Sequence, residues 1–220
     1  GKSADAATYA ALHSNIVTAF GNFFNSDGSF KDSSDQTGYA LAFTLDLVPA
    51  GLRAKAAGKF ADTIARFSDH LATGFIGTPR LLPALHLAGR DDLAYELLLR
   101  KTYPSWLYQV TLGATTMWER WDGWTPAGGF QSVGMNSFNH YAFGSVGEYM
   151  YGVVGGIQPA SPGYKSILIQ PVPGAGLTWA NTGYKSLRGQ ISTAWTHTGN
   201  TFDLEVVIPP NTSAQVHVPT

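Results

Sequence analysis

The spacing of apolar residues changes near residue 160 of this 220-residue chain, and this change most constrains the fold. Before it, apolar side chains recur every three or four residues, as in amphipathic helices. One such series occupies the first twenty residues: Tyr9, Leu12, Ile16 and Phe20. After it, short apolar runs alternate with polar residues between Gly, Pro and Asn turns, as in β-strands. We therefore expect a mainly α domain over residues 1–160 and a small antiparallel β-sandwich over residues 161–220.

Within the first part, buried and half-exposed helices are expected to alternate. Residues 36–47 are apolar nearly all round, as in a buried helix, whereas residues 52–67 carry their apolar side chains on one face. Asn136 and Ser137 are common N-cap residue types, and they predict a further helix that runs to about Tyr151.

The composition narrows the possible partners. The chain has 14 Lys and Arg residues and 15 Asp and Glu residues, which gives a net charge of -1. It therefore lacks the positive charge that binds nucleic acid. The absence of cysteine excludes disulfides and a thiol nucleophile. No apolar run approaches the roughly 18 residues that span a bilayer, and the first residues do not resemble a signal peptide. We expect a soluble chain without a membrane partner, in a compartment that the sequence does not define.

One long segment is almost free of charge. Residues 102–147 contain three charged side chains, Glu119, Arg120 and Asp122, set among tryptophans. A carboxylate that is partly desolvated by indoles yet adjacent to a fixed positive charge can be tuned as a general base. Aromatic rings beside an acid also suit sugars, whose C–H faces pack on indoles. The structural alternative is an ion pair between Arg120 and Asp122, with Glu119 capping a helix.

His140 is the second candidate, because no other His, acid or base occurs from Gly123 to Gly147. It can bond a sugar hydroxyl; the alternative is a hydrogen-bonded core histidine on an apolar helix. The six histidines show no spacing such as H-E-x-x-H, so we expect neither a metal site nor a cofactor. The G-x-S-x-G elbow, the phosphate loop and the dinucleotide-binding turn are also missing, which argues against the enzyme classes that use them.

Three segments carry long motifs: residues 103–106 (YPSW), 113–122 (GATTMWERWD) and 135–144 (MNSFNHYAFG). In these motifs the sequence resembles bacterial α-L-rhamnosidases of glycoside hydrolase family 78. The similarity extends over the whole chain, including residues 70–75 (HLATGF) and the strand-rich end. The resemblance implies part of an (α/α)6 barrel followed by a C-terminal antiparallel β-sandwich, and inverting hydrolysis of terminal α-L-rhamnose from rhamnosides.

The resemblance also implies roles for particular residues. Glu119, in the Trp-Glu-Arg-Trp motif, corresponds to the general base that activates water, and His140, in the Asn-His-Tyr motif, to a residue that contacts the sugar. Trp106, Trp118 and Trp121 are expected to shape the sugar pocket, without a distinction between those that touch sugar and those that only pack. The expected substrates are rhamnose-containing glycosides or polysaccharides.

The sequence departs from the family in length. Members of the family are much longer, and the segment that supplies their general acid lies upstream of the residues present in this chain. An inverting glycosidase needs two carboxyl groups, about 6.5–9.5 Å apart, so we expect the isolated chain to have little activity. A partial ring of helices would also expose the apolar faces of its end helices. The expected partner is therefore the N-terminal part of the same enzyme, or a second copy of the chain.

Two other functions remain open. One alternative is that the chain by itself is a noncatalytic carbohydrate-binding or structural unit. It is alternatively part of a different helical-barrel enzyme, such as another inverting glycosidase or a polysaccharide lyase, since one fold hosts many reactions. A lyase needs Arg or Lys to neutralise a uronate, and the charge-poor segment offers only Arg120.

Overall fold

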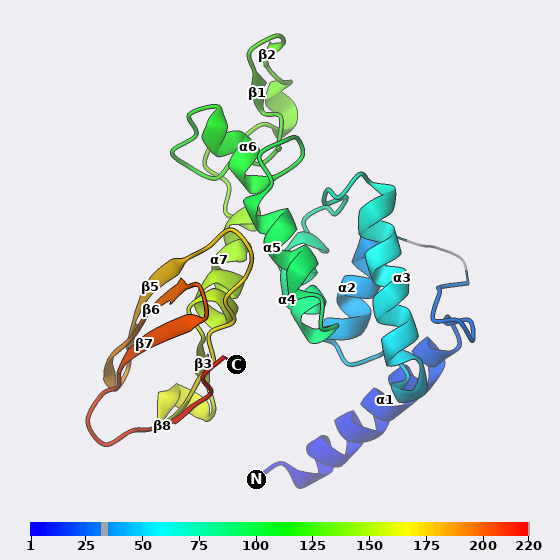
Figure 1. The fold of residues 1–220 in the computed structure, drawn as a ribbon. Helices are drawn as coiled ribbons and strands as arrows, with labels where there is room; N and C mark the ends of the chain where they lie inside the picture. The colour runs from blue at the N-terminus through cyan, green and yellow to red at the C-terminus, as the bar shows by residue number, and fades with distance from the viewer. Residues whose placement is uncertain (32–34, 220) are drawn as a thin grey trace. The chain divides into compact units, whose positions relative to one another are not determined.

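The computed structural model describes residues 1–31 and 35–219 and divides into two compact units, Gly1–Phe143 and Gly144–Thr220 (Figure 1). The first unit is mainly helical. Its α-helices are α1 (Ser3–Gly21), α2 (Gln36–Thr44), α3 (Arg53–Arg66), α4 (Thr78–Leu87), α5 (Asp91–Leu99) and α6 (Trp106–Thr111). It also contains the 3-10 turns η1 (Ala50–Leu52) and η2 (Val133–Met135) and a short hairpin of β1 (Trp124–Thr125) and β2 (Gly129–Phe130). A further 3-10 turn, η3 (Ala142–Ser145), spans the division between the units.

The core of the first unit forms around α2, which packs against α3 and α4, while α4 also packs against α5. Tyr39 and Phe43 of α2 both stack on Phe60 of α3, with ring centroids 5.6 and 5.9 Å apart. All three rings are at most 1% exposed. The expected buried helix is therefore confirmed in α2, and the expected half-exposed helix in α3, which buries one face only.

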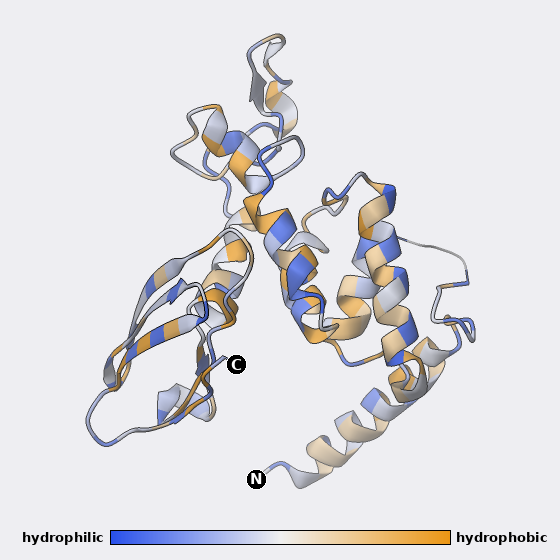
Figure 2. Cartoon of the chain, in the orientation of Figure 1, coloured by the Kyte–Doolittle hydropathy of each residue, from blue (hydrophilic) through white to orange (hydrophobic). Residues whose placement is uncertain are grey.

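The first helix has an uncovered apolar face. None of the residues of α1 is buried, and Figure 2 shows hydrophobic residues along its length. Three large side chains of the predicted apolar series are exposed: Tyr9, Leu12 and Ile16. The predicted helix is confirmed. As expected for the end helix of a partial ring, α1 exposes apolar side chains.

The second unit begins with α7 (Val146–Tyr149) and the π-helical turn η4 (Met150–Val154) and continues as a sandwich of two small sheets. One sheet has the order β3 (Ile157–Pro159), β4 (Ser166–Ile169), β8 (Ser213–Val216), with the 3-10 turn η5 (Pro162–Tyr164) between β3 and β4. The other has the order β5 (Trp179–Ser186), β6 (Gly189–Thr198), β7 (Thr201–Val207). All neighbouring strands pair antiparallel except β4 and β8, which are parallel.

The two sheets share one apolar core. Ile167 and Ile169 of the first sheet cluster with Ile191 of the second, and all three are at most 1% exposed. Thr193 and Trp195, which are buried on the same strand, donate hydrogen bonds to the carbonyl groups of residues 155 and 154 (2.6 and 2.8 Å). These bonds tie the inner face of the β5–β6–β7 sheet to the end of η4. The predicted fold class, helices followed by a β-sandwich, is confirmed.

The expected helix from Asn136 or Ser137 to Tyr151 is wrong over its first part. Residues 136–141 are irregular, and helical structure begins only with η3. The amide of Asn136 donates to the carbonyl groups of residues 123 and 131 instead of capping a helix (2.9 and 3.3 Å). Long-range hydrogen bonds therefore override the local capping signal.

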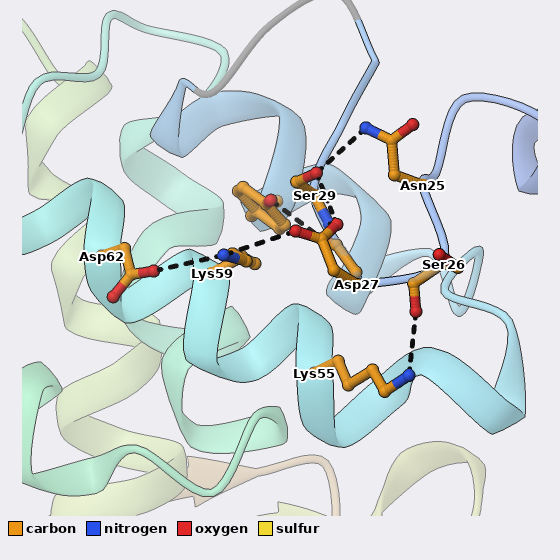
Figure 3. A network of polar contacts seen from close by, with 9 residues as sticks. Asn25, Ser26, Asp27, Ser29, Lys55, Lys59 and Asp62 are labelled. Carbon is orange, nitrogen blue, oxygen red and sulfur yellow. Dashed lines mark hydrogen bonds and ion pairs between the residues drawn. The ribbon is translucent and has the colours of Figure 1, made fainter.

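The loop after α1 is fixed to α3 by a polar network (Figure 3). Asp27 Oδ1 accepts hydrogen bonds from the backbone N–H and the hydroxyl of Ser29 (3.0 and 2.7 Å). From α3, Lys59 Nζ lies 3.5 Å from Asp27 Oδ2, and Lys55 Nζ donates to the carbonyl of Ser26 (2.9 Å). The hydrogen bonds from Ser29 and the charge of Lys59 lower the pKa of Asp27 to about 2, from an ordinary value of 3.8.

This lowered pKa predicts a pH-dependent contribution of Asp27 to stability. Because the folded state binds the proton less tightly than the unfolded state, the contribution is complete above pH 4 and is lost as the pH falls towards 2. Asp27→Asn keeps an oxygen acceptor and removes the charge. Its melting temperature should lie below that of the parent chain at pH 7 and converge with it near pH 2. A matched Asp62→Asn variant should have nearly the melting temperature of the parent chain at pH 7, because its exposed ion pair with Lys59 contributes little. A pH-independent difference for Asp27→Asn would contradict the assignment.

Candidate active site

The loop that carries Glu119 is anchored to α6 by one buried side chain. Gln109, which is 2% exposed, donates through Nε2 to the carbonyl of Arg120 (2.9 Å) and accepts through Oε1 from the N–H of Trp118 (3.5 Å). A single amide therefore holds the main chain on both sides of Glu119. Helix α6 begins at Trp106, and the hydroxyl of the preceding Ser105 caps it by accepting from the N–H of Tyr108.

A second loop runs alongside the first and orients the carboxylate. The N–H of Glu119 donates to the carbonyl of Ser137, and the N–H of Ser137 donates to Glu119 Oε2, both over 2.8 Å. The N–H of His140 donates to the carbonyl of Met117 (2.9 Å). In the part of the chain that the structure describes, Glu119 Oε1 has no hydrogen-bond partner. One oxygen of the carboxylate is thus fixed by the backbone, and the other is available. Glu119 does not cap a helix.

Glu119 lines an open cavity of about 280 Å³ within the first unit. The lining residues come from the loop after α3, the segment before α6, the Glu119 loop and η3: Thr73, Gly74, Phe75, Tyr103, Glu119, Arg120, Trp121, Asp122 and Phe143. Three of the five candidates from the sequence, Trp106, Trp118 and His140, are not among them. The cavity therefore combines carboxylates, a guanidinium and aromatic rings.

The charged groups in the cavity are paired in part. Arg120 Nε and Nη2 donate to the two carboxylate oxygens of Asp122 (3.1 and 3.3 Å), as the structural alternative predicted. These hydrogen bonds raise the pKa of the Arg120 guanidinium. Burial raises the pKa of the Tyr103 phenol, and the nearby charge of Asp122 adds to this effect. Asp122 is therefore paired with Arg120, whereas Glu119 has no ion pair among the described residues.

The three candidate tryptophans have different surroundings. Trp121 lines the cavity and stacks on Phe143, with ring centroids 3.9 Å apart and planes 10° apart. Trp106 lies perpendicular to Trp121 (5.5 Å) and donates its indole N–H to the carbonyl of Phe143 (2.8 Å). Trp118 packs edge-on against Phe138 (4.9 Å). All three are buried, but only Trp121 reaches the cavity.

His140 lies next to the cavity in an aromatic stack, and the segment that carries it is not helical. Its ring is nearly parallel to those of Phe75 (5.0 Å) and Tyr141 (5.7 Å). Its Nδ1 accepts from the N–H of Ala142 (3.4 Å), and its Nε2 has no partner within the residues described. Phe75 lines the cavity and also contacts Phe143, which stacks on Trp121. A chain of ring contacts therefore joins His140 to Trp121.

Phe75 and Tyr103 are among the cavity residues to which sequence reasoning assigned no role. Both lie in segments that carried the resemblance, residues 70–75 and 103–106, so the motifs themselves were the available signal. Among the described residues, no group of three or more His, Asp or Glu side chains could hold a metal ion. None of the described helices is long and apolar enough to cross a membrane.

Comparison with known proteins gives concordant matches over both units. Residues 1–154 match the model of the bacterial α-L-rhamnosidase six-hairpin glycosidase domain, and residues 156–220 match that of the bacterial α-L-rhamnosidase C-terminal domain. An α-L-rhamnosidase of Streptomyces avermitilis is 47% identical over 216 residues, which are 98% of this chain and 21% of the relative. One from Formosa agariphila is 43% identical over 221 residues, 100% of this chain and 24% of the relative.

Solved structures agree with these matches. The crystal structure of the S. avermitilis enzyme complexed with L-rhamnose superposes with a TM-score of 0.92 at 47% identity, covering 97% of this chain and 21% of that one. Native α-L-rhamnosidase from Aspergillus terreus superposes with a TM-score of 0.93 at 39% identity, covering 99% and 26%. The chain thus spans about a fifth to a quarter of the length of these relatives. It belongs to the bacterial α-L-rhamnosidase family, with a six-hairpin glycosidase domain over residues 1–154 and a C-terminal domain over residues 156–220.

Proposed function

We propose that this chain carries the general base of an inverting α-L-rhamnosidase and that Glu119 is that base. The observation that supports this role most directly is the asymmetry of its carboxylate. The backbone N–H of Ser137 holds Oε2, while Oε1 has no partner among the described residues, and Glu119 lines the cavity. A carboxylate held in this way can orient one water molecule and accept its proton.

The proposed reaction transfers two protons. Water bound at Glu119 attacks the anomeric carbon of the rhamnosyl group and gives a proton to the carboxylate. The bond from the anomeric carbon to the leaving oxygen breaks on the opposite face, and that oxygen takes a proton from a general acid. The new C–O bond forms on the face opposite the broken one, so the configuration inverts.

The general acid must be a carboxyl group that is protonated at the start of the reaction. The second carboxylate of the cavity, Asp122, does not fit this role, because both its oxygens accept hydrogen bonds from Arg120 and neither is turned to a leaving group. We place the general acid on polypeptide outside these 220 residues. The greater length of the relatives supports this placement.

The aromatic part of the cavity fits the apolar face of a deoxy sugar. Trp121 and Phe75 offer ring surface, and His140 Nε2 can bond a hydroxyl group at the end next to Phe75. Trp106 and Trp118 act through packing in this proposal, since neither lines the cavity. L-rhamnose, which is present in the S. avermitilis complex, is the sugar that we propose for this site.

A chimera tests the proposed function. This chain replaces the aligned 216 residues of the S. avermitilis relative, so that the rest of the relative supplies any missing carboxyl group. We expect the chimera to hydrolyse an aryl α-L-rhamnoside, with β-L-rhamnose as the first product by NMR, and the isolated chain to be inactive. A folded chimera without activity, or one that releases α-L-rhamnose first, would contradict the proposal.

His140→Ala in the chimera should lower kcat/KM by about 10-fold, because one hydrogen bond to a sugar hydroxyl contributes about 1–3 kcal/mol when its partner is left unpaired. The exposed His217 provides a control, and His217→Ala should leave kcat/KM unchanged. Unchanged kinetics with a lowered melting temperature for His140→Ala would instead show that His140 only packs against Phe75 and Tyr141.

A further inference from the structure

The outer face of the β5–β6–β7 sheet, in the second unit, carries residues suited to a ligand. Strand pairing places directly opposed residues on the same face of a sheet. Two adjacent rows of opposed residues cross the three strands: Trp179, Thr196 and Asp203 in one, and Asn181, Ala194 and Glu205 in the other. The inner face is occupied by the buried Thr193 and Trp195, so these two rows point away from the sandwich core.

The two rows border an open cavity of about 490 Å³. This volume is within the range of about 300–1,000 Å³ that is usual for small-molecule sites. The small Ala194 lies between Asn181 and Glu205 and leaves a hollow in the middle of the second row. Trp179, at the edge strand, is 65% exposed and forms the wall of the cavity at that edge. A large exposed indole beside such a hollow offers a flat apolar surface.

The polar groups around this hollow are free of protein partners. The carboxylates of Asp203 and Glu205, the side-chain amide of Asn181 and the indole N–H of Trp179 make no hydrogen bond or ion pair within residues 1–31 and 35–219. No Lys or Arg belongs to the described residues that line the cavity. The site therefore presents acceptors with negative charge, one amide and one aromatic ring.

We propose that this face is a second saccharide-binding site, separate from the Glu119 cavity, and that it takes a neutral sugar. The apolar C–H face of the sugar stacks on Trp179, while its hydroxyl groups donate to Asp203 and Glu205 and bond to Asn181. Two uncompensated carboxylates repel a uronate, which makes the site selective for neutral residues. The choice of L-rhamnose as the probe rests on the proposed function; the site itself does not depend on Glu119.

Fluorine NMR of the whole chain tests this proposal. Labelling with 5-fluorotryptophan gives a signal for each of the 6 tryptophans, and those of Trp179 and Trp121 are assigned with Phe variants. L-rhamnose should shift the Trp179 signal saturably, with a millimolar Kd, and D-galacturonate should not. Asp203→Asn combined with Glu205→Gln should raise the Kd at least 5-fold, whereas Glu148→Gln, an exposed carboxylate elsewhere in the second unit, should leave it unchanged.

The outcomes separate this site from the Glu119 cavity, which the Trp121 signal monitors. A saturable shift of Trp179 that the double variant weakens supports the second site, whether or not Trp121 responds. A shift of Trp121 alone overturns the second site and leaves the proposed function standing. The proposed site is overturned if Trp179 responds equally to rhamnose and galacturonate. It is also overturned if Trp179 responds equally to rhamnose in the parent and the double variant. Either result would show only nonspecific stacking on the indole.

Discussion

Glu119→Gln in the chimera should lower kcat by about 10³-fold and change KM little, since general-base catalysis contributes roughly 10²–10⁴-fold. The glutamine side chain has the same shape and keeps an oxygen that can accept from the N–H of Ser137. It cannot accept a proton from the attacking water. The loss should therefore appear in the chemical step and not in the binding of substrate.

Azide distinguishes loss of the base from general damage to the site. In a Glu119→Ala variant, azide attacks the anomeric carbon without needing a base, while the general acid still protonates the leaving oxygen. We expect azide to raise the rate of the variant and to yield β-L-rhamnosyl azide. Glu148→Gln, at an exposed position on α7, should retain the kcat of the chimera. A near-normal kcat for Glu119→Gln would remove this residue from the mechanism.

The charged part of the site could be predicted from local sequence, because its groups are neighbours in the chain. Arg120 and Asp122 pair across two residues, and both were recognised with Glu119 as a charged island in an apolar segment. The hydrogen bond that fixes Glu119 comes from Ser137, eighteen residues later in the chain. No spacing rule predicts such a contact, since both partners lie in irregular loops.

The same limit explains the aromatic residues. Trp106, Trp118 and Trp121 are close in sequence, but two of them are on loops, where side-chain direction follows no period. Only the structure separates Trp121, which reaches the cavity, from the two that pack. Phe75 joins the site from the loop after α3, far away in the chain.

The fold was more predictable than the site. Its elements could be predicted wherever apolar residues kept the same spacing over several helical turns. The helices α1, α2 and α3 followed from apolar spacing, and the strand-rich character of the sandwich from short apolar runs that alternate with polar residues. Strand β5 contains Asn181 and Gly183, which disfavour strands, and its pairing with β6 supplies the stability that its residues do not. The expected helix from residue 136 failed for a similar reason, because tertiary hydrogen bonds decided the local structure.

Gln109 is the residue whose loss should most affect catalysis without any contact with the substrate. Its amide holds the backbone at Trp118 and Arg120 together, so Gln109→Leu leaves both groups without this partner and frees the loop that carries Glu119. We expect a loss of stability of about 1–3 kcal/mol. We also expect kcat in the chimera to fall about 100-fold, because a displacement of about 1 Å in a catalytic group can have that effect.

A matched variant separates positioning from stability. Thr193→Val removes another buried side-chain hydrogen bond, to the carbonyl of Gly155 in the second unit, and should destabilise the protein to a similar extent without changing kcat. Both variants are assayed well below their melting temperatures. If Gln109 positions Glu119, kcat for Gln109→Leu should fall well below that for Thr193→Val, while KM should stay close to its original value. Equal kcat values for Gln109→Leu and Thr193→Val would mean that the Glu119 loop keeps its catalytic geometry without the Gln109 amide.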